Sequence, residues 1–296
     1  MLINEALGGY MNRRSFLTTG AGAVSLNAFP YHLYAGTEKK YASDIVTLGP
    51  RKIKLSRLAM GTGTNGAGGS SNQTKKLGLT GLANLLHASV DQGITFWDSA
   101  DQYGTHPYVK EALKQTPREK VVILSKTHAS TTAEMKADID RFRREIGTDY
   151  IDILLLHCMM DGNWPERKKG AMEYISELQE KGIVRTHGVS CHTMAALKSS
   201  LASPWVEVQL ARLNPAGVAM DAAPGDVIPV LRQMKAAGKG VIGMKIFGAG
   251  KLRHVTGECL QFALAQEVLD CFTIGSESVA EMTATIKEMP VASVRG

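Results

Sequence analysis

The sequence has no long apolar run and no block of charge of one sign. No stretch approaches the about 20 apolar residues that a membrane-spanning helix requires, so we expect no stable transmembrane span. The net charge of +6 comes from interspersed lysines and arginines, which indicates a solvated surface and argues against binding of nucleic acid. With 44% hydrophobic and 21% charged residues, the composition is that of an ordinary globular protein.

Cysteine is scarce, and its spacing does not suit a metal site. The four cysteines, Cys158, Cys191, Cys259 and Cys271, form no C-x-x-C pair, which argues against zinc or an iron–sulfur cluster. We therefore expect no bound metal. Cys158 and Cys191 both follow predicted strands, so a disulfide between them stays open, although small buried side chains are the favoured interpretation.

The amino terminus carries an arginine pair ahead of a weakly apolar stretch. Arg13 and Arg14 are followed by Ser-Phe-Leu and by residues rich in Gly, Ala and Thr as far as Phe29. This order is typical of a twin-arginine signal. We expect the export machinery as a partner and a periplasmic location, or a cytoplasmic one if the signal does not function. Whether cleavage follows Ala35 stays open.

Beyond residue 40, strand-like and helix-like patterns alternate. Apolar runs of strand length recur at 57–60, 94–98, 121–125, 151–156, 184–189, 206–210, 241–245 and 268–274. Helical spacing follows them at 80–92, 108–114, 133–146, 171–181, 194–201, 227–237, 258–266 and 279–289. A hairpin pattern precedes the series at 45–55.

Eight alternations predict an α/β protein, a (β/α)8 TIM barrel with an N-terminal β-hairpin. We assign residues 41–296 to the barrel and residues 1–40 to the signal segment. An open doubly wound sheet is the alternative. Gly61-Thr62-Gly63 superficially matches its glycine fingerprint, but no helix begins directly after it, so the barrel is favoured.

Three consecutive strand patterns end in a polar group. Asp98, Lys126 and His157 each follow an apolar run, and Tyr103 lies on the loop after Asp98. A charged or polar group at such a place is costly unless it is paired or belongs to a site. Because the carboxyl ends of barrel strands form one mouth, we expect these four side chains to meet there.

This ordered set resembles the aldo-keto reductase family, whose motif is an Asp, a Tyr five residues on, and a Lys and a His after the next two strands. The resemblance covers residues 45–289 and implies an NAD(P)-dependent oxidoreductase that interconverts a carbonyl and an alcohol in a small substrate. It assigns Tyr103 as general acid/base and Lys126 as the cation that lowers its pKa. Asp98 would hold Lys126, and His157 would orient the substrate oxygen.

The resemblance also places the nicotinamide. Ser190 and Gln209 match residues that hold its carboxamide in the family. Cys191, a poorer hydrogen-bonding group, stands where the family has an Asn. Met244 stands where the family has an aromatic ring that stacks on the nicotinamide, and its thioether can cover a ring without π stacking.

The adenosine end departs from the family pattern. Gly275 and Ser276 begin a predicted helix and can offer backbone N–H groups to a pyrophosphate. The family often has a Lys at the position of Gly275 and an Arg at that of Glu281, and both grip the extra phosphate of NADP. A carboxylate at that place repels a phosphate, so the resemblance implies a preference for NAD. Other cations that can replace the missing pair are Lys245, Lys251 and Arg253.

Two other functions fit the same residues. In the first, Lys126 is the Schiff-base nucleophile of a barrel lyase or aldolase. In the second, the chain is an exported, non-catalytic binding protein that has lost its cofactor, as the departures at Cys191, Met244, Gly275 and Glu281 suggest. The few residues after Pro290 predict an open pocket with broad substrates, and the physiological substrate and reaction direction stay open.

Overall fold

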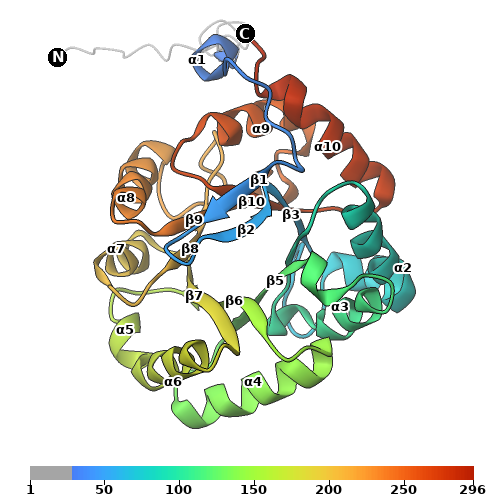
Figure 1. The fold of residues 1–296 in the computed structure, drawn as a ribbon. Helices are drawn as coiled ribbons and strands as arrows, with labels where there is room; N and C mark the ends of the chain where they lie inside the picture. Colours follow the sequence, from blue (N-terminus) through green and yellow to red (C-terminus); the bar gives the residue numbers. More distant parts are fainter. Residues whose placement is uncertain (1–28) are drawn as a thin grey trace, which may run out of the picture. The chain divides into compact units, whose positions relative to one another are not determined.

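The computed structural model describes residues 29–296, so the arginine pair of the predicted export signal lies outside the described residues. Within the compact unit Tyr31–Gly296, parallel strands form a closed barrel in the order β10-β3-β4-β5-β6-β7-β8-β9 (Figure 1). This confirms the predicted (β/α)8 fold. The barrel strands are β3 (Leu58–Gly61), β4 (Phe96–Asp98), β5 (Val122–Thr127), β6 (Ile151–Met159), β7 (Val184–Cys191), β8 (Val208–Arg212), β9 (Gly240–Met244) and β10 (Cys271–Gly275).

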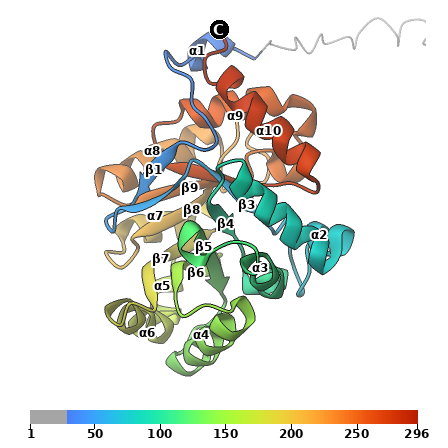
Figure 2. The ribbon, with the colours of Figure 1, turned by 45° about the vertical axis from the view of Figure 1, so that its right-hand side comes forward.

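Helices surround the barrel on all sides (Figure 2). Those that connect the strands are α2 (Asn72–Asp91), α3 (His106–Leu113), α4 (Thr132–Ile146), α6 (Lys169–Glu180), α7 (Met194–Ala202), α8 (Pro224–Ala236), α9 (Thr256–Ala265) and α10 (Val279–Ala292). Shorter helical segments are α1 (Tyr31–Tyr34), α5 (Trp164–Arg167), η1 (Asp101–Tyr103), η2 (Arg118–Lys120), η3 (Gly248–Gly250) and η4 (Arg253–Val255). Among the described residues, no helix combines the length and the apolarity of a membrane span.

The predicted hairpin is present and lies across one end of the barrel (Figure 1). Its strands β1 (Ile45–Leu48) and β2 (Ile53–Ser56) pair antiparallel, and their buried apolar side chains join the core inside the barrel. A Cβ on Gly240, the first residue of β9, would lie 2.7 Å from the side chain of Leu48. The hairpin therefore covers the end at which β9 begins, and the carboxyl ends of the strands form the other end.

Helix α2 begins earlier than the helical spacing predicted. Ser71 and Thr74 form a capping box that starts the helix at Asn72. Gly78, with φ of 63°, then interrupts the helical backbone. The pattern that begins at Thr80 marks only the second segment, because the polar first segment carries no apolar periodicity.

The compact unit begins at Tyr31, before the boundary that we drew at residue 41. The backbone N–H of Gly36 donates to the carbonyl of Ser293 at 2.7 Å. Lys40 Nζ donates to the carbonyl of Leu264 at 2.6 Å. Residues 31–40 thus pack against the last two helices of the barrel.

All four cysteines carry free thiols, so Cys158 and Cys191 are not paired. Cys191, Cys259 and Cys271 are buried, as the favoured interpretation expected, and Cys158 is half-buried.

Candidate active site

A buried ion pair lies at the carboxyl ends of β4 and β5. Lys126 Nζ donates to Asp98 Oδ1 and, at 2.8 Å, to the carbonyl of Ser99. The side chain of Lys126 is 1% exposed, so water does not screen this pair. Burial lowers the pKa of Lys126, but Asp98 and Tyr103 together more than offset this and raise it. Lys126 is therefore an ammonium throughout the neutral range.

Tyr103, on η1, lies against this ion pair. Lys126 Nζ is 4.7 Å from the centre of the Tyr103 ring. The His157 ring meets the Tyr103 ring edge-on, with centroids 5.6 Å apart, and stacks on His128 at 4.9 Å. The structure thus brings together all four side chains that the sequence predicted to meet.

Burial shifts the pKa values of both Tyr103 and His157, and the shift of Tyr103 differs from the one we predicted. Burial, the largest effect, raises the pKa of the Tyr103 phenol, and Lys126 lowers it without cancelling that rise. The net direction is therefore opposite to the lowering that we predicted. Burial, with Lys126 next in effect, lowers the pKa of His157 to about 2, so its imidazole is neutral at physiological pH.

Two glycines of the loop between β3 and α2 hold the Tyr103 ring. A Cβ on Gly63 would lie 2.1 Å from Tyr103 Cε2, and one on Gly66 would lie 2.3 Å from Cδ1. Both distances are far shorter than a van der Waals contact, so any larger residue would displace the ring. This close approach explains the glycines, and the sequence offered only a Gly/Ser-rich loop as a signal.

The substitution Gly63→Ala should therefore impair catalysis without unfolding the barrel. If Tyr103 is the general acid that the sequence predicts, displacing the phenol by about 1 Å should lower kcat about 100-fold. Gly225→Ala is the matched control, since nothing lies within 4 Å of a Cβ at that position. Steady-state kinetics and circular dichroism of both variants make the comparison, and an unchanged kcat for Gly63→Ala would contradict the role of the loop.

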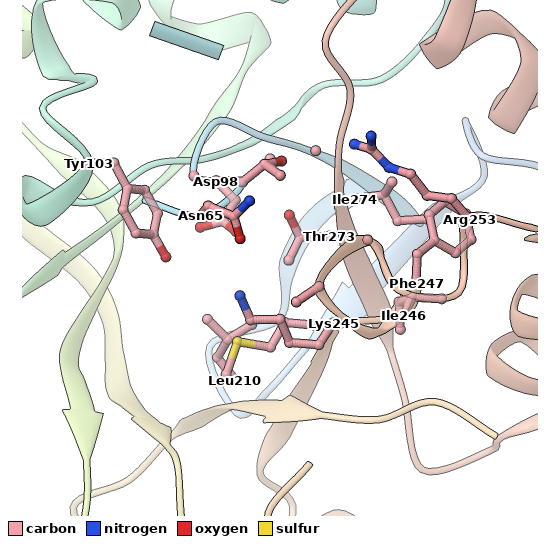
Figure 3. Close-up of a pocket in the computed structure, with 17 residues that line it drawn as sticks. Asn65, Asp98, Tyr103, Leu210, Lys245, Ile246, Phe247, Arg253, Thr273 and Ile274 are labelled. Carbon is pink, nitrogen blue, oxygen red and sulfur yellow. The ribbon is translucent and has the colours of Figure 1, made fainter. Parts of the chain in front are cut away.

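A cleft opens beside Tyr103 at this end of the barrel (Figure 3). It contains about 680 Å³ of empty space, including the part open to solvent. The Tyr103 hydroxyl and Asp98 lie at one side, and Arg253 and Ile274 lie at the other. Of the predicted site residues, those that line the cleft are Asp98, Tyr103, Met244, Lys245 and Gly275.

Comparison with known proteins identifies the family. The model of the Aldo/keto reductase family matches residues 57–267, which include the whole ion pair, the phenol and the imidazole. The chain belongs to the aldo/keto reductase family. It spans about half the length of the curated relatives it matches.

Relatives and solved structures of the family show how far the likeness extends. Aldo-keto reductase YhdN of Bacillus subtilis is 28% identical over 159 residues, which are 47% of this chain and 44% of the relative. Methylglyoxal reductase YeaE of Escherichia coli is 35% identical over 142 residues, 46% of each chain. The holo form of an aldo-keto reductase from Bacillus halodurans has a TM-score of 0.68 at 19% identity, covering 83% of this chain and 90% of its own.

The residues predicted to hold the nicotinamide carboxamide do not line the cleft. Gln209 lies between Val208 and Leu210, whose side chains fill the barrel, so the alternation of a strand directs Gln209 to the helix side. There Gln209 accepts a hydrogen bond from Ser200 of α7 and donates to the carbonyl of Leu210 at 2.9 Å. Cys191 also contacts Gln209, at 3.7 Å.

Ser190 and Ser276 are buried outside the cleft. Ser190 Oγ accepts from the backbone N–H of Cys158 at 2.8 Å and so shapes the end of β6. Met244 and Gly275, in contrast, do line the cleft. A Cβ on Gly275 would lie 2.3 Å from Thr64 Oγ1, so only glycine allows β10 to pack this closely against the loop after β3.

Thr273 is one of several cleft residues that the sequence analysis did not identify. Thr273, on β10, lines the cleft, and its Oγ1 is buried with no hydrogen-bond partner among the described residues. A threonine is an ordinary strand residue. Only the alternation of side chains in the run Cys271–Ile274, which directs Thr273 to the inside of the barrel, could have indicated it.

Metal ligation is not needed to explain the acidic groups near the site. Asp101, His106 and Glu145 lie close enough together to hold an ion. The guanidinium of Arg141 already bonds Asp101 Oδ2 at 2.9 Å and Glu145 Oε1 at 3.4 Å. This cluster is therefore accounted for as a partly buried network of ion pairs.

Proposed function

We propose that the chain is an NAD(P)-dependent oxidoreductase that interconverts a carbonyl and an alcohol, with Tyr103 as general acid/base. One observation carries the proposal: a buried Lys126–Asp98 pair lies against a phenol whose hydroxyl points into a cleft. A buried ion pair that served the fold alone would need no phenol and no cleft beside it.

The cleft fits a dinucleotide along one wall. Gly275 lines this wall without a side chain, and the Thr273 hydroxyl is buried beside it with no hydrogen-bond partner among the described residues. Arg253 supplies a cation near Gly275. When bound, the nicotinamide supplies or accepts the hydride. The carboxamide, however, must be held by groups other than Gln209, because that side chain faces α7.

The residues of the chain then transfer the proton and stabilise the charge that its transfer leaves behind. In reduction, Tyr103 Oη gives its proton to the substrate oxygen as that oxygen gains negative charge. The resulting phenolate is stabilised by the Lys126 ammonium, which Asp98 and the Ser99 carbonyl hold in place. The neutral imidazole of His157 can donate a hydrogen bond toward the same oxygen without competing as an acid.

The two alternative functions receive less support. A Schiff-base nucleophile must be an uncharged, accessible amine, whereas Lys126 is buried and its pKa is raised. A binding protein without a cofactor has no need of a phenol held by Gly63 and Gly66 beside an ammonium. Export by the twin-arginine route stays a separate hypothesis, which rests on Arg13, Arg14 and the weakly apolar stretch that follows them as far as Phe29.

The purified chain tests the proposal directly. Isothermal titration with NADH and NADPH should show binding of at least one dinucleotide. Methylglyoxal is the first substrate to try, because the Escherichia coli relative is named a methylglyoxal reductase. Absence of both dinucleotide binding and reduction of methylglyoxal or other small aldehydes would refute the proposed function.

We also propose a preference for NAD over NADP. Arg253, the cation at the far side of the cleft, is shared between Glu277 at 3.3 Å and Glu281 at 3.5 Å. Glu281 also accepts from the backbone N–H of Glu277 at 2.7 Å, which fixes the second carboxylate. Lys76 also pairs with Glu277, at 3.4 Å, so each cation of this cluster is already engaged by a carboxylate and none is free to bind the extra phosphate of NADP.

The double substitution Glu277→Gln and Glu281→Gln should shift this preference. Removing two negative charges should tighten NADPH binding roughly tenfold and leave the affinity for NADH nearly unchanged. Glu288→Gln, on the same helix α10, is the control, since it bonds Thr256 and does not line the cleft. Titration of both dinucleotides measures the effect, and tight NADPH binding by the unaltered chain would contradict the charge argument.

A further inference from the structure

We propose, on the basis of the proposed function, that Lys245 binds a carboxylate of the substrate. The chain would then act on 2-oxo acids and 2-hydroxy acids in preference to neutral carbonyl compounds. Lys245 follows β9 directly and lines the same cleft as Tyr103. Lys245 thus lies at the same end of the barrel as Tyr103, but it makes none of the contacts that position the Tyr103 ring.

The backbone of Lys245 is held in one conformation. Its φ of 58° is rare for a residue with a side chain. The carbonyl of Lys245 accepts from Gly248 N at 2.8 Å and from Asn214 Nδ2 at 3.1 Å. These bonds fix where the chain turns after β9, so the direction in which the side chain leaves the backbone is set before any ligand binds.

The side chain of Lys245 extends into the cleft toward Asp98 and the Tyr103 hydroxyl (Figure 3). Its ammonium has no hydrogen bond or ion pair within residues 29–296. A partly buried ammonium without a partner is costly, and an anion in the cleft would remove that cost. Burial, followed by the charge of Lys126, lowers the pKa of Lys245, which agrees with a crowded positive site.

The neighbouring charges are already balanced. Asp98 is paired with Lys126. Arg212 is paired with Asp221, whose side chain is fully buried. Lys245 therefore carries the uncompensated positive charge at this side of the cleft, and an anion from outside the chain would neutralise it.

The position of this ammonium favours a substrate over a cofactor phosphate. Arg253, the other cation of the cleft, lies near Ile274 on the far side, whereas Lys245 reaches to the side of Tyr103 (Figure 3). The carbonyl that accepts the Tyr103 proton must lie on that same side. A carboxylate attached to the carbonyl carbon would reach the ammonium, and it would take no part in the bond changes.

The test compares pyruvate with methyl pyruvate, which differ in the negative charge. Three proteins are compared: the unaltered chain, Lys245→Met, which keeps the length of the side chain but not its charge, and Lys198→Met. Lys198, on α7, is exposed and lies outside the cleft, so it serves as the charge-matched control. The ratio of kcat/KM for the two substrates is the readout, because it does not depend on the fraction of folded enzyme.

We expect the unaltered chain to prefer pyruvate. Lys245→Met should lower the ratio roughly 10- to 100-fold, the cost of losing a hydrogen bond to a charged group. Lys198→Met should leave the ratio unchanged. An unchanged ratio in Lys245→Met overturns the proposal, and if the affinity for NADH falls in the same variant, the anion is a phosphate of the cofactor.

A second measurement separates binding from covalent chemistry. If borohydride in the presence of pyruvate attaches the substrate to Lys245, the residue acts as an amine nucleophile and the anion-binding proposal is wrong. Failure of the proposal is distinct from failure of the proposed function. Reduction of methylglyoxal without any preference for pyruvate overturns only the role of Lys245, whereas absence of dinucleotide binding and of all reduction removes the oxidoreductase assignment itself.

Discussion

Tyr103→Phe should lower kcat for carbonyl reduction roughly 100- to 10,000-fold, the usual range for loss of a general acid. The Tyr103 hydroxyl is directed into the cleft beside Asp98 (Figure 3), and Phe keeps the ring that packs on Gly63 and Gly66. The fold and the dinucleotide affinity should therefore be nearly unchanged. Single-turnover reduction of methylglyoxal, with titration of NADH, measures the two quantities separately.

Tyr108→Phe is the matched control for this variant. Tyr108 lies on α3, five positions further along the chain, and does not line the cleft. Because burial raises the pKa of Tyr103, the phenol keeps its proton through the neutral range, and the reduction rate of the unaltered chain should stay flat between about pH 6 and pH 9. Equal rates for Tyr103→Phe and the unaltered chain would remove Tyr103 from the mechanism.

Lys126→Met should affect both stability and activity. It leaves Asp98, which is 6% exposed, as an unpaired buried carboxylate. Breaking a buried pair in this way costs about 3–5 kcal/mol of unfolding free energy. Activity should fall by at least about 100-fold, because the Tyr103 phenolate loses the cation that stabilises it. Urea denaturation and steady-state kinetics measure the two effects.

The double variant Asp98→Asn with Lys126→Met separates the two effects. Removing both charges leaves no unpaired ion, so most of the lost unfolding free energy should return. Activity should not return, since no ammonium faces Tyr103. Recovery of catalysis along with stability would mean that Lys126 supports only the fold, and our assignment of its role would be wrong.

Three predictions from the sequence differ from the structure: the orientation of Gln209, the pKa of Tyr103 and the start of α2. The departure at Gln209 could have been foreseen, because Val208 and Leu210 on either side read as inward-facing residues. The pKa of Tyr103 could not, since its direction depends on how deeply the loop with Gly63 and Gly66 covers the ring. The early start of α2 depended on a capping box in a polar segment, which periodicity does not detect.

The sequence by itself determined the barrel and the set of residues at its mouth. Eight alternations admit few topologies, and parallel strands bring their carboxyl ends to one face, so Asp98, Lys126 and His157 had to meet. Only the tertiary structure decided that Gln209 bonds Ser200 of α7 and that Lys245 is left without a partner among the described residues that surround the cleft. Periodicity determines on which face of a strand a side chain lies. The partners of that side chain depend on loops and helices distant in sequence, and no local pattern specifies where those loops and helices run.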